Sequence, residues 1–303
     1  MNKKLRGSIF LLLATIIWGS AFVSQSIGME HIGPFTFQAV RCFLAVVGLL
    51  PVILIFDRRK KDGKTFISRW ANKKLWVTGI LCGIPLFLAC NLQQVGLVDT
   101  DAGKSGFLTA MYIVIVPVIG IFLKRKVTAM VPISVALAVI GLYFLSCFGV
   151  SGISLGDLLT IGCAVMFAVQ ITLIDTLAKD LDALRLNAIQ ALVCAVLSAI
   201  VMLFTEEPTL EAITACALPL AHAGFLSMGA AYSLQILGQK DLEPTAASLI
   251  MSLESVFAVI FGAWILSERM TPWECIGCIL MFIAVVLSQI PTNKTSKVEV
   301  LEH

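Results

Sequence analysis

Long apolar runs alternate with short polar segments along the whole chain. A helix needs roughly 20 mostly apolar residues to cross a bilayer. Ten runs of about this length occupy residues 8–26, 34–56, 75–98, 104–123, 129–148, 157–178, 185–204, 216–237, 245–266 and 272–290. The connections are short and rich in turn formers, which leaves no room for a large extramembrane domain. The pattern therefore predicts an all-α membrane protein with ten transmembrane helices.

Composition excludes several classes of protein. Of the 303 residues, 58% are hydrophobic and 14% are charged, whereas a soluble domain has about 25% charged residues. A soluble enzyme is therefore excluded, and the net charge of +3 is too balanced for a protein that grips nucleic acid. Eight of the nine cysteines lie in apolar runs, which favours buried thiols over a disulfide scaffold. The two histidines outside the tail, His31 and His222, lack metal-ligand spacing, and we expect no cofactor.

The basic residues are sorted between alternate connections. With the N-terminus inside, 19 of the 22 Lys and Arg residues fall in connections on that same side. Lys104 and Arg269 lie outside, and Arg41 lies within a span. Because basic loops stay cytoplasmic, we predict that both termini are cytoplasmic. The first run follows three basic residues as in a signal peptide, but it continues apolar beyond Ala21 and nine similar runs follow, which indicates a retained helix.

The two halves of the chain resemble each other weakly. Residues 37–41 match 186–190 at an offset of 149, residues 91–96 match 233–238 at an offset of 142, and residues 124–128 match 267–271 at an offset of 143. These offsets align the first five runs with the last five. An odd number of spans makes the second copy enter the membrane from the opposite side.

The sequence thus predicts two inverted-topology five-helix repeats, residues 1–150 and 151–292, followed by a polar cytoplasmic tail at 293–303. The tail ends in Leu-Glu-His, like the remnant of an expression tag. In secondary transporters such repeats hold a substrate site near the midplane. Duplication kept only for structural symmetry is the alternative.

Two ionisable residues lie deep in the predicted spans. Arg41 and Glu254 are candidates because a charge at the bilayer centre costs at least about 2.5–3.5 kcal/mol, and at about 1.5 Å per residue their depths differ by about 6 Å. Glu254 would bind a cationic group or a proton, with Arg41 as its partner or as the anchor of a substrate carboxylate. A purely structural ion pair, or a Glu254 held neutral by burial, is the alternative.

A second set of candidates is uncharged. Amides within a span cannot hydrogen-bond to lipid, so they face a helix interface or a wet cavity, and aromatic rings can stack on a planar or quaternary-amine solute. The substrate-binding candidates beside Arg41 and Glu254 are Trp18, Ser20, Gln38, Asn91, Gln94, Tyr112, Phe167, Gln170, Gln190, Tyr232 and Gln235. Contact between helices is the alternative for each. Gln93 and Gln235 are repeat mates, as are Arg41 and Gln190, which favours a cavity on the pseudo-twofold axis; adjacent Gln93 and Gln94 cannot both face it.

Glycine spacing predicts two close helix contacts. Gly79 and Gly83 form a true G-x-x-x-G pattern, which permits close helix approach. Gly224 and Gly229 also permit it, although their spacing is one residue longer than this pattern.

Several strings resemble the drug/metabolite transporter superfamily, in its ten-helix type built from two EamA domains. They lie at residues 16–23, 41–45, 102–117, 247–258 and 267–273. The resemblance implies export, less often uptake, of small metabolites such as amino acids or amphipathic cations through a central cavity. Ser255 stands where the family usually has proline, and Lys124–Lys126 replace an acidic residue.

We therefore expect a secondary transporter, not an enzyme, in the bacterial cytoplasmic membrane. It would move a small organic metabolite or amphipathic compound by alternating access, in the export direction, driven by a substrate gradient or by protons carried on Glu254. An uptake permease or facilitator of the same fold, and a non-transporting receptor or scaffold, are the alternatives. Its partners would be the solute and the bilayer, with no nucleic acid. The sequence does not separate a monomer from a dimer.

Overall fold

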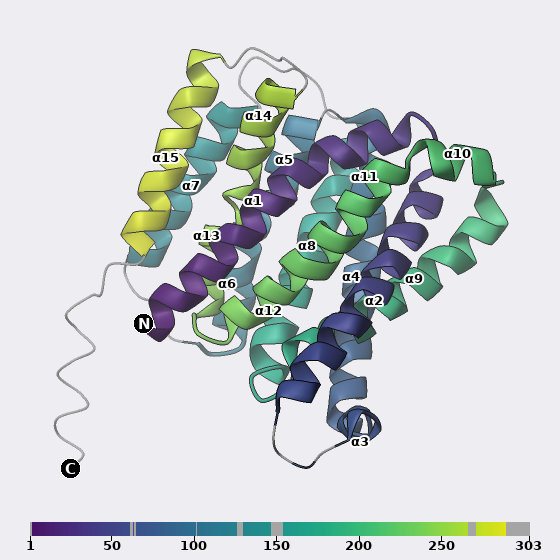
Figure 1. The fold of residues 1–303 in the computed structure, drawn as a ribbon. Helices are drawn as coiled ribbons and strands as arrows, with labels where there is room; N and C mark the ends of the chain where they lie inside the picture. Colours follow the sequence, from purple (N-terminus) through teal and green to yellow (C-terminus); the bar gives the residue numbers. More distant parts are fainter. Residues whose placement is uncertain are drawn as a thin grey trace, which may run out of the picture.

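The computed structural model describes residues 2–60, 63, 65–100, 102–125, 130–146, 154–265 and 271–288, and every regular element in these ranges is helical (Figure 1). The elements are α1 (Lys3–Met29), α2 (Pro34–Arg59), α3 (Phe66–Trp70), α4 (Lys73–Asp99), α5 (Ala102–Ala110), α6 (Tyr112–Phe122), α7 (Met130–Ser146), α8 (Leu155–Leu177), α9 (Ala183–Thr205), α10 (Leu210–Ala215), α11 (Ala217–Ala221), the π-helix η1 (His222–Ala231), α12 (Tyr232–Gln239), α13 (Pro244–Met251), α14 (Glu254–Ile265) and α15 (Pro272–Ser288). The all-α prediction is confirmed for this part of the chain. The polar tail at 293–303 and most of the third pair of repeat strings lie outside it.

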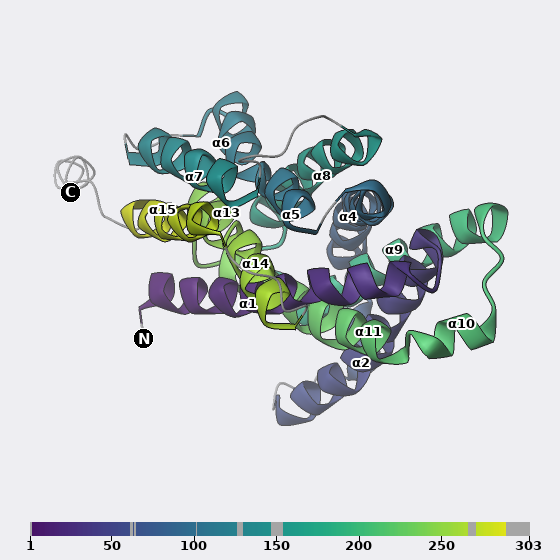
Figure 2. The ribbon, with the colours of Figure 1, turned by 90° about the horizontal axis from the view of Figure 1, so that it is seen from above.

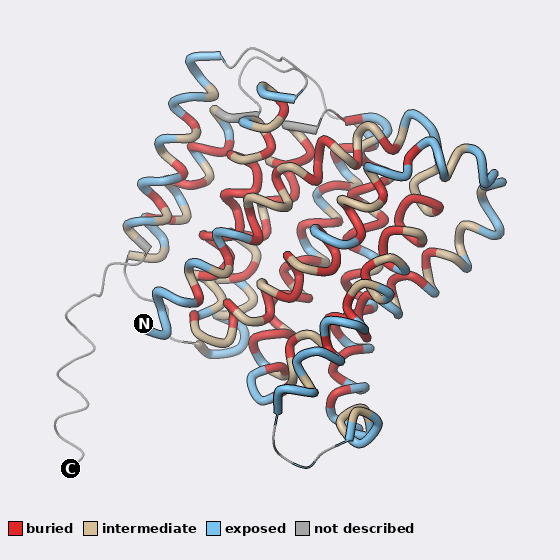
Figure 3. Tube along the Cα trace, in the orientation of Figure 1, coloured by how far each residue is buried: buried red, intermediate tan, exposed pale blue. Residues whose placement is uncertain are grey.

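Seven helical segments are long and apolar enough to cross a membrane: Lys3–Met29, Pro34–Arg59, Lys73–Asp99, Lys104–Phe122, Leu155–Leu177, Ala183–Thr205 and Pro244–Ile265. Two shorter apolar helices, Met130–Phe144 and Pro272–Leu287, fall on two further predicted runs. The remaining run, 216–237, contains α11, η1 and α12. Large apolar side chains such as Phe43, Leu203 and Phe204 are exposed on the outside, and buried positions gather inside the bundle (Figure 3). This chain is a multi-pass membrane protein.

Most contacts between helices of the two halves occur twice. In the second occurrence, each helix is replaced by its equivalent in the other half. Helix α4 packs on α8, and η1 with α12 packs on α1; helices α5 and α6 pack on α8, and α13 and α14 pack on α1. In the same way α4 packs on α9, and η1 packs on α2. The pairs α2–α9 and α7–α15 each join equivalent helices; Figure 2 shows α7 lying along α15.

Two spans are interrupted at equivalent positions. Between α5 and α6 only Met111 leaves the helix, and between α13 and α14 the break is at Ser252 and Leu253. Met111 and Leu253 are 142 residues apart, which is the offset between the repeat strings at 91–96 and 233–238. Each break is a tightened turn, since the N–H of Met111 donates to the Leu108 carbonyl at 3.3 Å and the N–H of Leu253 donates to that of Ile250 at 3.1 Å. Both spans therefore bend without leaving these amides unpaired.

The residue that departs from the family pattern takes part in the second break. The N–H of Ser255 donates to the Ser252 carbonyl at 3.3 Å, a bond that a proline at this position could not make.

The π-helix explains the unusual spacing of Gly224 and Gly229. In a π-helix the hydrogen bonds run from i to i+5, so residues five apart lie on one face. A Cβ on Gly224 would lie 2.7 Å from Leu44 Cβ, and one on Gly229 would lie 3.9 Å from the Cα of Ala45, both in α2. The spacing is one residue longer than G-x-x-x-G, and within the π-helix Gly224 makes the close contact with α2 while Gly229 makes an ordinary one. The G-x-x-x-G of α4 faces α9.

Basic residues from separate loops meet at one end of the bundle. Arg6 pairs with Asp241 at 2.7 Å, Arg125 with Asp175 at 2.5 Å, and Arg185 with Asp57. Burial raises the pKa of Asp182 at this end, but hydrogen bonds from the Arg185 backbone N–H and from Lys60 outweigh it, so this pKa lies below its ordinary value. The N-terminus and the α2–α4, α8–α9 and α12–α13 connections thus share one end of the bundle.

At the opposite end Glu206 caps helix α2 from the neighbouring α9. Its carboxylate accepts the backbone N–H groups of Phe35 at 2.9 Å and Thr36 at 2.8 Å, and the Thr36 hydroxyl at 2.6 Å. These are orphan donors of a helix N-terminus. Glu206 therefore holds the start of α2 against the end of α9.

We expect Glu206→Ala to lower the melting temperature of the purified protein, because loss of a cap costs about 0.5–2 kcal/mol. Differential scanning fluorimetry in detergent measures the shift. The matched control is Glu207→Ala, since Glu207 is exposed and its loss removes no cap. Equal melting temperatures for the two variants would contradict this role.

Candidate functional site

A small pocket with a cavity volume of ≈ 30 Å³ lies within the bundle. Its walls come from both halves of the chain. It is lined by Trp18, Phe22, Gln25, Arg41, Gln93, Tyr112, Phe167, Ile171, Ser227, Tyr232, Gln235, Met251 and Glu254. Seven of the thirteen residues that the sequence nominated are among them: Trp18, Arg41, Tyr112, Phe167, Tyr232, Gln235 and Glu254.

The two interrupted spans meet at this pocket. Tyr112 is the first residue of α6 and Glu254 the first of α14, so each stands directly after a break. The Tyr112 hydroxyl donates to Glu254 Oε1 at 3.0 Å, and both side chains are buried. Like the breaks, the two residues are 142 positions apart, so they are repeat mates that bind each other. The sequence signalled each alone, but nothing in it showed that they touch.

Arg41 is held by a glutamine that the list of candidates omitted. Its Nη1 donates to Gln25 Oε1 at 2.7 Å, and the amino group of Gln25 donates to the Ala21 carbonyl at 3.3 Å. The guanidinium is 3% exposed, and its Nε has no hydrogen-bond partner. Among the described residues no ion pair within 4.0 Å joins Arg41 to Glu254. The structure thus does not have the direct ion pair between spans 2 and 9, and both charged groups line the pocket independently.

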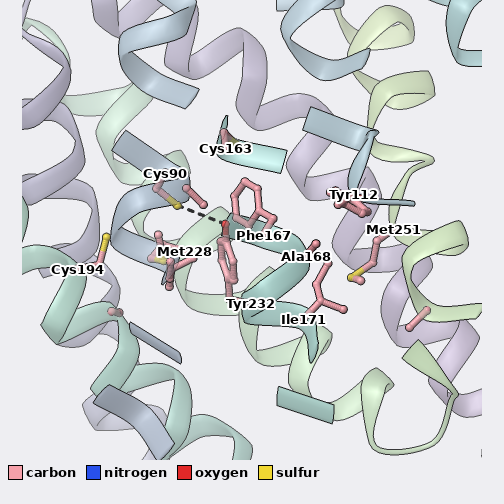
Figure 4. Close-up of a cluster of buried hydrophobic side chains, with 14 of the residues drawn as sticks. Cys90, Tyr112, Cys163, Phe167, Ala168, Ile171, Cys194, Met228, Tyr232 and Met251 are labelled. Atoms are coloured by element: carbon pink, nitrogen blue, oxygen red, sulfur yellow. Dashed lines mark hydrogen bonds between the residues drawn. The ribbon is translucent and has the colours of Figure 1, made fainter. Parts of the chain in front are cut away.

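Aromatic rings form much of the remaining wall. The rings of Trp18 and Tyr232 meet edge to face at 5.0 Å, and the indole Nε1 of Trp18 has no partner. Figure 4 shows the Tyr232 hydroxyl against the Cys90 thiol at 3.5 Å, with Phe167 beside them. Arg41 Nε–H and Trp18 Nε1–H are thus two donors without a partner on residues that line the pocket, whose wall is part polar and part aromatic.

The other nominated residues lie behind the pocket wall and bind protein groups. Ser20 contacts His222 at 3.1 Å, the Gln38 amide donates to the thiols of Cys42 and Cys194, and the Asn91 amide donates to the Phe87 carbonyl and Ser198. Gln170 and Gln190 bind each other at 3.4 Å. Gln94 is buried without a partner. None of these six residues lines the pocket, and all but Gln94 bind protein groups.

Six lining residues were not nominated. Gln93 was recognised as the repeat mate of Gln235, and it is Gln93, not its neighbour Gln94, that lines the pocket. Gln25 carried the same signal as the other intramembrane amides. Phe22, Ile171, Ser227 and Met251 gave no chemical signal, since apolar and small residues are common throughout the spans. No group of three His, Cys, Asp or Glu side chains in the described ranges is arranged to hold a metal ion.

Comparisons with known proteins agree with this architecture. Residues 5–147 and 154–289 each match the model of the EamA-like transporter family. An uncharacterized transporter of Archaeoglobus fulgidus is 33% identical over 291 residues, covering 94% of this chain and 86% of the relative. The uncharacterized transporter YoaV of Bacillus subtilis is 23% identical, covering 92% and 94%.

A crystal structure described only as that of a protein shares the fold, with a TM-score of 0.75 at 17% identity over 93% of this chain and 97% of that one. The two family matches together span nearly the whole of the described bundle. The chain is a membrane transporter that belongs to the EamA-like transporter family.

Proposed function

We propose that this protein is a secondary transporter that moves a small organic solute through the central pocket by alternating access. The observation that carries the proposal is the meeting of two equivalent helix breaks at Tyr112 and Glu254. In such transporters the substrate site lies near the midplane at the interface of the repeats, and Tyr112 and Glu254 come from different repeats. Rocking of one repeat against the other would expose the pocket to each side in turn.

The topology that we propose has ten spans in two inverted repeats, residues 1–150 and 151–292. Support comes from the helix pairs, which exchange when the halves are exchanged. The basic loops share one end of the bundle, and basic loops stay cytoplasmic. Both termini are then cytoplasmic, in the cytoplasmic membrane of a bacterium.

The solute that we propose is a small metabolite or amphipathic compound of the amino acid or organic cation class. Glu254 supplies a carboxyl group for a cationic group, Arg41 supplies free donors for a carboxylate, and the aromatic rings supply an apolar wall. The direction is export, and Glu254 carries the coupling proton. The residues behind the wall, among them Gln38, Asn91 and Gln94, would act by positioning the helices.

Reconstitution into liposomes tests the proposal. We expect purified protein to accelerate efflux of at least one compound from a panel of radiolabelled amino acids and organic cations, and to catalyse counterflow of that compound without ATP. Liposomes without protein are the control. Binding of a compound from one side only, with no flux for any member of the panel, would replace the transporter by a receptor.

A further inference from the structure

A head-to-tail chain of four amides leads away from the pocket wall. It joins Gln235, Gln170, Gln190 and Asn187, and it ends on the π-helix. From this chain we infer that Gln235 presents its carbonyl oxygen to the pocket, and that this oxygen accepts a hydrogen bond from a protonated amine of the transported solute. The inference rests on the proposed function, because it assumes that the pocket is where the solute binds.

The anchor of the chain fixes the orientation of Asn187. Its Nδ2 lies 2.9 Å from the Met228 carbonyl and 2.8 Å from the Gly229 carbonyl. It also lies 2.9 Å from the Ser233 hydroxyl, whose own proton goes to the Gly229 carbonyl at 2.7 Å. Carbonyl oxygens only accept. The nitrogen of Asn187 must therefore face η1, and its oxygen must face away.

Each following amide is then fixed by the one before it. The oxygen of Asn187 requires a donor, which is Gln190 Nε2 at 2.9 Å. The oxygen of Gln190 takes Gln170 Nε2 at 3.4 Å, and the oxygen of Gln170 takes Gln235 Nε2 at 3.1 Å. A flip of any member would set two amino groups or two oxygens against each other. Two backbone carbonyls of the π-helix thus fix the orientation of the Gln235 amide through the side chains of three helices. The nitrogen of Gln235 is bonded, and its oxygen has no partner in the chain of amides.

What is left over is an acceptor in the pocket. Gln235 is 2% exposed, it lines the pocket, and its Oε1 has no hydrogen-bond partner. A buried acceptor without a partner is costly, so a solute that brings an N–H donor gains from filling this position. Glu254 and Arg41 line the same pocket, so a solute with an amine and a carboxylate finds an acceptor and a donor beside Gln235.

Two cations with the same ring and charge separate a hydrogen bond from simple charge attraction. Benzylammonium carries three N–H donors, and benzyltrimethylammonium carries none. We expect purified wild-type protein to bind benzylammonium at least about tenfold more tightly, as a hydrogen bond to a charged group implies. Isothermal titration calorimetry in nanodiscs measures both dissociation constants.

Substitution of Gln235 should remove this preference selectively. For Gln235→Leu we expect the ratio of the two dissociation constants to fall below about threefold, mainly through weaker benzylammonium binding. Gln239→Leu is the matched control, because Gln239 is a buried amide on the same helix that donates to the Ile171 carbonyl and does not line the pocket; it should behave as wild type. If Gln235→Leu does not fold, Gln170→Leu, which frees Gln235 to turn its amino group inward, should show the same fall.

Three results would overturn the inference. They are an unchanged ratio in Gln235→Leu, an equal loss of both probes in that variant at an unaltered melting temperature, and wild-type protein that binds neither probe up to millimolar concentration. None of these results touches the proposed function, because the panel of solutes in liposomes decides separately whether transport occurs. Flux without a donor preference would leave a transporter whose pocket uses Gln235 for helix contact alone.

Discussion

Replacement of Glu254 with glutamine is expected to abolish solute flux driven by a pH gradient and to leave the fold intact. Glu254 is 6% exposed, lines the pocket and accepts a hydrogen bond from Tyr112. The surroundings of a carboxyl group that is removed from water decide how readily it binds and releases a proton. Glutamine has the same shape and can still accept from Tyr112, but it cannot carry a proton. Coupled flux should therefore fall to the level of empty liposomes.

The measurement is accumulation of a transported compound in liposomes with an imposed pH gradient, compared with its exchange at equal pH. Exchange should persist in Glu254→Gln if only the coupling is lost. The matched control is Glu243→Gln, since Glu243 is an exposed carboxylate next to the same broken span. Tyr112→Phe removes the hydrogen bond and keeps the carboxyl group, so we expect it to shift the pH profile without ending transport. Undiminished coupled transport in Glu254→Gln would remove Glu254 from the mechanism.

The sequence indicated Arg41 and Glu254 for a physical reason that survives folding. A charge in a span must find a polar site, and both residues line the same pocket. Amides gave a weaker indication. An amide that hydrogen-bonds to a neighbouring helix is as well accommodated within the bilayer as one that faces a wet cavity. Gln38 and Asn91 have such partners on α9, whereas Gln235 lines the pocket and its oxygen has no partner. Whether an amide faces a neighbouring helix or the pocket depends on how the helices pack, and hydropathy carries no information about that packing.

Hydropathy also gave no indication of the two turns beside which Tyr112 and Glu254 lie. A run of 20 apolar residues reads the same whether it is one helix or two, so the turns at Met111 and Leu253 gave no signal. The π-helix did leave a signal, the five-residue spacing of Gly224 and Gly229. This spacing puts both glycines on one face only in a π-helix, and the sequence pattern assumes α-helical periodicity. The repeat offset carried more information than any single residue. It relates the two breaks to each other and Tyr112 to Glu254, and these two repeat mates meet at the pocket.

The offsets of 142 and 149 relate two helix crossings at which backbones touch. A Cβ on Gly96 in α4 would lie 2.9 Å from the Gly156 carbonyl of α8, and one on Gly238 in α12 would lie 2.9 Å from the Gly7 carbonyl of α1. Gly96 and Gly238 are 142 positions apart, and Gly7 and Gly156 are 149 apart. Carbonyl oxygens of a packed helix cannot move aside as a flexible side chain can. Each crossing therefore requires the absence of a side chain on both helices.

We expect Gly96→Ala and Gly238→Ala each to destabilise the protein by about 3 kcal/mol, at the upper end of the cost of overpacking, and to lower the melting temperature by several degrees. The matched control is Gly162→Ala on α8, where a Cβ meets only the end of Leu92 at 3.5 Å, an ordinary contact. Because the two crossings share none of these residues, the double variant should lose about the sum of the single effects. Thermal unfolding in detergent, followed by tryptophan fluorescence, measures all four proteins. A melting temperature for either crossing variant equal to that of Gly162→Ala would show that the helices have room to separate there, and that the symmetric backbone contact does not hold the repeats together.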